Sequence, residues 1–170
     1  TALLVLAILL WPLPAAFAAG ERGIPEGPVN IVADRIIYTA DEDIFDAAGA
    51  VEITFTGGFL KADRVTVTRG TSQAWAEGNV VLQSGGDRLA GERLFFNLIS
   101  KTGTLHDGRM FIAENHLYVQ GERIEKRAEA TYRLQNGSVT SCDGETPDWR
   151  IAGREMDLTV DGYGTIKHGR

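Results

Sequence analysis

An internal repeat of about 29 residues constrains this chain more than any other feature of its sequence. One phrase consists of an apolar residue, any residue, a small residue, an acid and an arginine. Its copies read IVADRIIY (31–38), LKADRVTV (60–67), LAGERLFF (89–96), VQGERIEK (119–126) and, more weakly, IAGREMDL (151–158). A second phrase, a glycine with apolar residues two and four positions later, begins at Gly49, Gly78, Gly108 and, more weakly, Gly137. Two interleaved phrases with one period indicate stacked supersecondary units.

Each repeat has room for two β-strands. Apolar and polar residues alternate in 51–55 and again in 65–68, as expected for strands with one buried face. We find no helical stripe of apolar residues over three turns, so we expect almost no helix in 29–141. Gly57-Gly58, Gly85-Gly86 and Asn136-Gly137 are typical of tight turns. The sequence therefore predicts an all-β fold with two strands in each repeat.

The first phrase also predicts a bend in its strand. In LKADRVTV, Leu60 and Ala62 share one parity, whereas Val65 and Val67 share the other. Strand side chains alternate strictly, so one buried face can hold both pairs only if the strand bulges between them. Bent strands in stacked copies would form two facing antiparallel sheets, an open β-sandwich that grows by adding repeats.

The charged residues of the repeat suggest structure more than chemistry. The acid–arginine pairs at 34–35, 63–64, 92–93 and 122–123 point to opposite faces of a strand, so we expect cross-strand charge ladders and no catalytic dyad. The three histidines are dispersed, and we recognise no nucleophile–base pair, nucleotide-binding loop or metal-ligand spacing. We expect no enzyme activity, cofactor or metal. The net charge of −6 argues against nucleic acid as a partner.

The first 28 residues differ from the repeats. Residues 1–18 combine an apolar run with Ala16-Phe17-Ala18, a small-residue cleavage pattern, and are interpreted as a signal peptide. A retained membrane anchor is the alternative, although Pro12 and Pro14 interrupt the apolar stretch. Residues 19–28 are interpreted as a flexible linker. The single cysteine, Cys142, either pairs with a thiol outside this chain or is a buried free thiol.

A sandwich made of repeats need not close, and splayed sheets would leave an apolar slot suited to acyl chains. The expected lipid contacts are the alternating apolar positions of the middle repeats. They are Val51, Ile53, Phe55, Val65, Val67, Val80, Leu82, Leu94, Phe96, Met110 and Ile112. Thr54, Thr66 and Gln83 should face the other way.

Several stretches resemble the OstA/LptA-like β-jellyroll domain of lipopolysaccharide transport proteins. They are 33–53, 60–67, 75–82 and 103–112. SCDGETPDWRI (141–151) and DGYGT (161–165) are similar to the segment that follows this jellyroll in the LptD family of outer-membrane assembly proteins. The resemblance implies a jellyroll over 29–141. It also implies that 142–170 hold the last strands and the start of the connection to a β-barrel that this sequence lacks.

The resemblance further implies an exported, periplasmic domain, attached to the outer membrane where a barrel follows. The domain would bind lipopolysaccharide and pass it toward the outer membrane. The other implied partners are the barrel portion, its plug lipoprotein and a jellyroll of the transport bridge, and Cys142 would form a disulfide with the missing region. The bridge jellyroll would add a strand at an edge formed by Val29, Ile31, Val32 and Ile36, which have no earlier repeat to pair with.

Two other functions fit the same residues. The chain could be a free-standing periplasmic lipopolysaccharide bridge protein, which would not need Cys142. It could also be a structural β-solenoid or adhesin with a closed, dry core and no ligand. Titration with a lipid or a hydrophobic dye distinguishes the last alternative, because a closed core binds neither.

Overall fold

The computed structural model describes residues 28–169 except 129, 145 and 161, so the predicted signal peptide and nearly all of the predicted linker lie outside the described residues. The described part consists of strands, turns and bends, with no helix. The strands are β1 (Asn30–Val32), β2 (Arg35–Thr39), β3 (Ile44–Phe55), β4 (Gly58–Thr68), β5 (Gln73–Ser84), β6 (Asp87–Asn97), β7 (Thr102–Ile112), β8 (Leu117–Ala128), β9 (Thr131–Thr140), β10 (Ile151–Thr159) and β11 (Gly164–Lys167). No helix that could cross a membrane occurs within these ranges.

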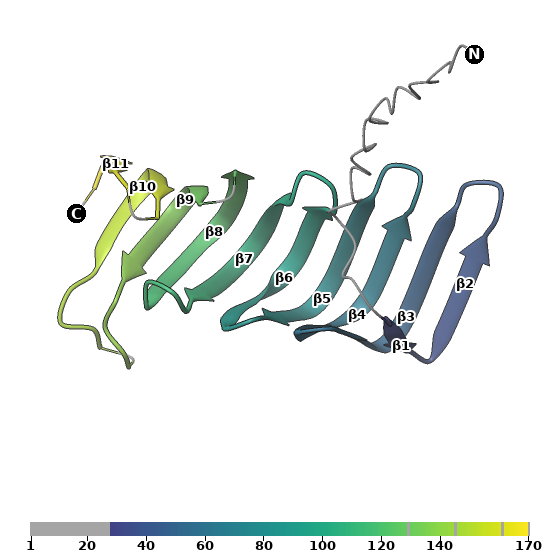
Figure 1. The fold of residues 1–170 in the computed structure, drawn as a ribbon. Coiled ribbons are helices and arrows are strands. Elements are labelled where there is room, and N and C mark those ends of the chain that lie inside the picture. Colours follow the sequence, from purple (N-terminus) through teal and green to yellow (C-terminus); the bar gives the residue numbers. More distant parts are fainter. Residues whose placement is uncertain (1–27, 129, 145, 161, 170) are drawn as a thin grey trace, which may run out of the picture.

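The strands form one antiparallel sheet in which nearly every strand pairs with its neighbours in sequence (Figure 1). Its order is β1-β3-β4-β5-β6-β7-β8-β9-β10-β11, and β2 also pairs with β3. β1 and β2 thus act as one interrupted edge strand, together covering most of the length of β3. The predicted all-β, repeat-built architecture is confirmed. The two facing sheets expected from the bend are instead two arms of one continuous sheet.

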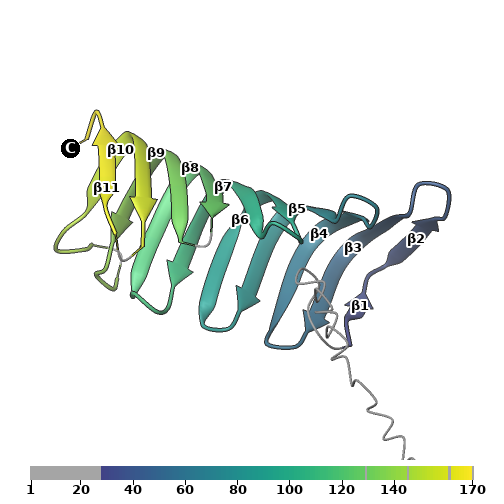
Figure 2. The ribbon, with the colours of Figure 1, turned by 45° about the horizontal axis from the view of Figure 1, so that its top comes forward.

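Each long strand bends near its middle, and the bends align along the stack (Figure 2). In β3 the bend contains Gly49 and Ala50, with φ of 82° and 44°, and in β5 it contains Gly78 and Asn79, with φ of 73° and 49°. The strand register shifts at these places. In β4 the predicted parity break is confirmed, because Ala62 and Val65 are both buried. The repeat therefore encodes a row of bulges that curves the sheet.

The two sequence phrases meet at these bulges. The Asp63 carboxylate lies against Gly78 and accepts a hydrogen bond from Asn79 Nδ2 at 2.9 Å. Asp34 lies against Gly49 in the same way, and its backbone N–H donates to the Gly49 carbonyl at 2.9 Å. The acid of one phrase thus packs on the bulge of the next strand. This contact explains why the two phrases share one period.

Two of the three predicted glycine-containing turns are hairpin turns, and the third is not a turn. Gly57 and Gly85 have φ of 87° and 60° and lie in hairpin turns, as predicted. The turn predicted at Asn136-Gly137 is wrong, because both residues lie within β9. Asn136 has φ of 45° at the mid-strand bend, so the same left-handed conformation that favours Asn-Gly in turns is used there for a bulge.

The core lies on the concave side of the bent sheet. Its most deeply buried large side chains are Val51, Val80, Val119 and Leu134, all near the bends. At Gly91 and Gly108 an added Cβ would overlap the Leu105 side chain, so the small residues of the phrases make room for core leucines. Partly buried apolar side chains pack against this core toward the strand ends.

Candidate functional site

One row of apolar side chains crosses the concave face from the first strand to β10. Its members are successive cross-strand partners: Ile31, Ile53, Leu60, Leu82, Leu89, Met110, Val119, Val139 and Ile151. We call this set the apolar row. At about 4.8 Å between neighbouring strands, eight steps span roughly 38 Å. Ile53, Leu60, Leu82, Leu89 and Met110 are only partly buried, so the middle of the row keeps accessible apolar surface. The row is a continuous apolar track across the sheet.

The eleven predicted lipid contacts all have the parity of this concave face, but burial divides them. Five are core residues: Val51, Val65, Val80, Leu94 and Ile112, each at most 7% exposed. Ile53, Leu82 and Met110 belong to the apolar row, and Phe55, Val67 and Phe96 are also half-buried. The half-buried residues are therefore the better candidates for contact with a ligand. Leu60 and Leu89 were missed, although both begin a copy of the phrase and share the parity of its small residue.

The predicted partner edge is unpaired on its outer side in the described structure. β1 and β2 have β3 as their only neighbouring strand there. Val29, Ile31, Val32 and Ile36 are 43%, 38%, 57% and 49% exposed. A strand edge with free backbone groups and exposed apolar side chains is suited to pairing with another strand.

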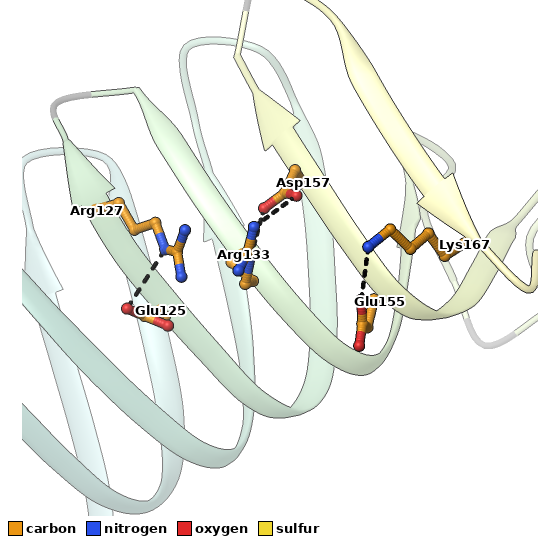
Figure 3. Close-up of polar contacts among 6 residues, drawn as sticks. All are labelled: Glu125, Arg127, Arg133, Glu155, Asp157 and Lys167. Carbon is orange, nitrogen blue, oxygen red and sulfur yellow. Dashed lines mark hydrogen bonds and ion pairs between the residues drawn. The ribbon is translucent and has the colours of Figure 1, made fainter.

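Charged side chains fasten the last strands on the convex face (Figure 3). Arg133 of β9 donates two hydrogen bonds to Asp157 of β10, at 2.6 and 2.9 Å. Lys167 of β11 lies 3.3 Å from Glu155 of β10. The hydrogen bonds from Arg133 lower the pKa of Asp157 below its usual value of 3.8. These contacts link β9, β10 and β11 through side chains as well as through the backbone.

The acid–arginine phrases have a structural role, and two of their arginines lie across from an opposite charge, because Arg64 and Arg93 are both register partners of Glu77 in β5. Arg64 pairs with Asp46 of β3, which lies outside any phrase, and Arg64 lowers the pKa of that carboxyl. The phrase acids Asp63 and Glu122 instead accept hydrogen bonds from Asn79 and Asn136 at the bulges. The reason is geometric: adjacent positions of one strand point in different directions, so acid and arginine reach different neighbours.

The segment that carries Cys142 is held at the end of the sheet by polar contacts. The Cys142 backbone N–H donates to Thr140 Oγ1 at 3.1 Å, and Thr140 Oγ1 donates to the Trp149 carbonyl at 2.6 Å. Asp143 Oδ1 accepts from Tyr118 at 2.6 Å and lies 2.9 Å from His116 Nε2. The Tyr118 and His116 contacts lower the pKa of Asp143. Cys142 itself is a half-buried free thiol in this structure.

Sequence reasoning missed the cluster around Asp143. Phe111 and Tyr118 pack with ring centroids 4.8 Å apart, and His116 meets both rings edge-on. Nothing in the periodic phrases marks it, because Asp143 lies 25 residues beyond Tyr118. Among the described residues, no group of three or more His, Cys, Asp or Glu side chains is placed to hold a metal ion.

Comparison with curated proteins finds LPS-assembly proteins LptD. The chain is 29% identical to the protein of Aromatoleum aromaticum over 165 residues and 30% identical to that of Acinetobacter baylyi over 169 residues. These matches cover 87% and 92% of this chain but 21% and 20% of the relatives. The chain therefore spans about a fifth of their length. No family model matches the chain.

Among solved structures, the fold is similar to LptH from Pseudomonas aeruginosa, described as the LptA-homologous periplasmic component of a lipopolysaccharide transport device. The match has a TM-score of 0.55 at 14% sequence identity and covers 81% of this chain and 96% of LptH. The LptA-like jellyroll predicted from the sequence is thereby confirmed as the fold. The predicted similarity to LptD proteins is confirmed over most of the chain.

Proposed function

We propose that this chain is a periplasmic domain that binds lipopolysaccharide and guides it toward the outer membrane. The observation that carries the proposal is the apolar row, which runs from the β1 edge to β10 and keeps accessible side chains as far as Met110, whereas Val119 and Val139 are buried. The similarity to LptD sequences and to the LptH fold supports lipopolysaccharide as the cargo. The work of such a domain is binding and transfer, with no bond made or broken.

The mechanism follows from burial of acyl chains. Each methylene that leaves water contributes about 0.8 kcal/mol, and an acyl chain lying along the row gains this at every position. Because neighbouring residues of the row have similar side chains, the free energy changes little as the chain moves one strand along. Leu60, Leu82 and Leu89 illustrate this similarity on three successive strands. A cargo can therefore bind strongly in total and still slide with small barriers between steps.

The exposed β1–β2 edge supplies a way to lengthen the track. A similar jellyroll whose last strand paired there would place its own apolar face next to Ile31, the first member of the row. Cargo would then pass between domains without entering water. The outer-membrane barrel and its plug lipoprotein would receive the cargo at the other end. A disulfide from Cys142 to the barrel region would fix that end in place.

Site-specific photo-crosslinking tests the proposal. A photo-crosslinker placed at Ile53, Leu82 or Met110 should capture lipopolysaccharide, because these side chains are accessible on the concave face. The same probe at Thr54 or Gln83, which are exposed on the convex face, should not. Equal capture at both sets would refute the track, and absence of capture at the first set would favour a structural β-solenoid.

The free-standing bridge protein is the second candidate. Its fold is the one that LptH has, so the sheet alone does not separate the two. The ordered contacts of Thr140, Cys142 and Asp143 favour the assembly-protein alternative, because a free-standing bridge has no need of this segment.

A further inference from the structure

A groove lies on the convex face of the sheet, on the side opposite the apolar row. It has a volume of about 570 Å³ and is lined by parts of β6, β7, β8 and β9 and by the segment before β10. Its lining includes Leu89, Met110 and Val119 of the apolar row together with the residues on either side of them, and the side chains of these three pack on the core side. Because side chains alternate along a strand, the flanking side chains point away from the core and into the groove. The groove therefore shares three positions with the lipid track, but its polar side chains lie on the other face of the sheet.

The charge of this groove is opposite to that of the chain. Arg88, Arg109 and Arg150 line it, and the lining contains no carboxylate among the described residues. The chain as a whole carries a net charge of −6. None of the three arginines has a carboxylate within 4.0 Å in the described structure, whereas Arg64 and Arg133 do. Three guanidinium groups around one groove, without a carboxylate partner among the described residues, create a local site for an anion.

Uncharged polar groups and a fixed wall complete the groove. Arg109, Gln120 and Ser138 are successive cross-strand partners on β7, β8 and β9, so hydrogen-bonding side chains continue the line from the arginine. The wall is the segment with Cys142 and Gly144, which Asp143 ties to Tyr118 at 2.6 Å. The groove thus exists before any ligand binds, which lowers the entropy lost on binding.

We propose that this groove binds the phosphate groups of a glycolipid head, namely the head of the lipopolysaccharide whose acyl chains follow the apolar row. This inference rests on the proposed function. Guanidinium groups form paired hydrogen bonds with phosphate oxygens, and the groove has the volume of a small ligand site. An acidic peptide is less suited, because β6 to β9 have strand partners on both sides and offer no free backbone edge.

The position of the groove fits this cargo. Arg88 is the second residue of β6, directly after the β5–β6 hairpin, and Tyr118 is the second residue of β8. The groove therefore lies near the rim of the arm whose concave face carries the apolar row. A head held at the rim would remain outside while its acyl chains lie inside. The arginines would hold the head in one orientation during each step.

Titration calorimetry with deacylated lipopolysaccharide tests the site without involving the apolar row. The chain should bind this head, and Arg88→Gln and Arg109→Gln should each weaken binding about tenfold or more, the effect of losing a charged hydrogen bond. Arg93→Gln is the matched control, because Arg93 is an exposed arginine of β6 that does not line the groove. Binding should also weaken as salt is added.

The possible outcomes separate the alternatives. Unchanged binding of the deacylated lipopolysaccharide in both groove variants would overturn the proposal. The proposal would also fail if the chain bound inorganic phosphate or a glutamate-rich peptide but did not bind the deacylated lipopolysaccharide. Photo-crosslinking of lipopolysaccharide from Ile53 in the same variants distinguishes failure of the groove proposal from failure of the proposed function. Head binding without acyl capture would contradict the proposed function alone. Acyl capture without head binding would contradict the groove alone.

Discussion

At the scale of single residues, the bulge at Gly78 and Asn79 shows how two short phrases specify one bend. Gly78 has a φ of 73°, which costs glycine little and other residues about 1–2 kcal/mol. The Asp63 carboxylate occupies the space where a Cβ would be and accepts a hydrogen bond from Asn79. The glycine is thus required twice, by the backbone conformation and by the packed acid.

Replacement of Gly78 by alanine should lower the free energy of unfolding by roughly 1–2 kcal/mol, because the new Cβ is strained at positive φ and displaces Asp63. Urea denaturation measures the loss. In an Asp63→Ala background the same change should cost less, because the carboxylate that overlaps the new Cβ is gone and only the Cβ of residue 63 remains close, at 2.9 Å. Gly70→Ala is the control, with open space around its Cβ and no positive φ. An equal effect at both glycines would contradict this explanation.

At the scale of elements, neighbouring strands are held by backbone pairing along their whole length and by side-chain contacts at particular places. β9 and β10 share a long register and the two hydrogen bonds between Arg133 and Asp157. Within the described residues, the β1–β2 edge and β11 each have a strand partner on one side only. The two ends differ because ion pairs join β9, β10 and β11, whereas the open β1–β2 edge exposes apolar side chains.

The Arg133–Asp157 contact predicts a pH dependence of stability. The pKa of Asp157 is lowered in the folded state, so its contribution is complete above the unfolded value of 3.8 and is lost as the pH falls through the lower folded value. Asp157→Asn should therefore destabilise the chain near pH 6 and have little effect near pH 2 (both approximate). Thermal unfolding of both proteins across this range measures the difference. A constant difference at every pH would show that the charge of Asp157 plays no part.

The open edge predicts where a second jellyroll docks. Proline at Ile31 or Val32 removes a backbone donor, and at the position whose N–H faces outward this loss should weaken strand addition while leaving the fold intact. Binding of an LptA-like domain, with circular dichroism to check folding, measures the effect. Ile166→Pro on β11 is the control at the other end of the sheet. Unchanged docking with proline at each edge position in turn would exclude this edge as the junction.

At the scale of the whole molecule, the fold places an apolar track and a cationic groove back to back on one arm. The row from Ile31 to Ile151 crosses the concave face, and Arg88 and Arg109 line the groove behind it. A single curved sheet can do this because its two faces carry alternate residues of the same strands. An amphiphilic cargo could then meet an apolar surface and a cationic surface on the same arm.

Obstruction of the track should reduce lipid binding without disturbing the groove. Leu82 is half-buried in the middle of the apolar row, so Leu82→Trp should fill the space beside it and reduce binding of a hydrophobic dye and of lipopolysaccharide several-fold, about 1 kcal/mol. Fluorescence titration measures both. Gln83→Trp adds the same ring to the exposed convex face and should leave binding unchanged. Equal binding by the two variants would contradict a cargo path along the row.

Much of this fold is local in origin and could be predicted from residue order alone. The period, the alternation in 51–55, the hairpin glycines and the parity break between Ala62 and Val65 all depend on residues close in sequence. Strand geometry turns such patterns directly into strands, turns and bends. The eleven apolar candidates share the concave face because of the same alternation. The prediction of a turn at Asn136-Gly137 was wrong because the same backbone conformation occurs in turns and in bulges, and the local sequence does not distinguish the two.

Other features arise only when distant residues are brought together. Half-burial of Met110 and full burial of Val80 depend on where each lies relative to the bend, although both have the same parity. The contact of Asp63 with Gly78, the Asp143 cluster and the three arginines of the groove join residues from different strands or loops. Periodicity determines which face a side chain takes. The register and curvature of the folded sheet decide which side chains it meets and how much water remains around it.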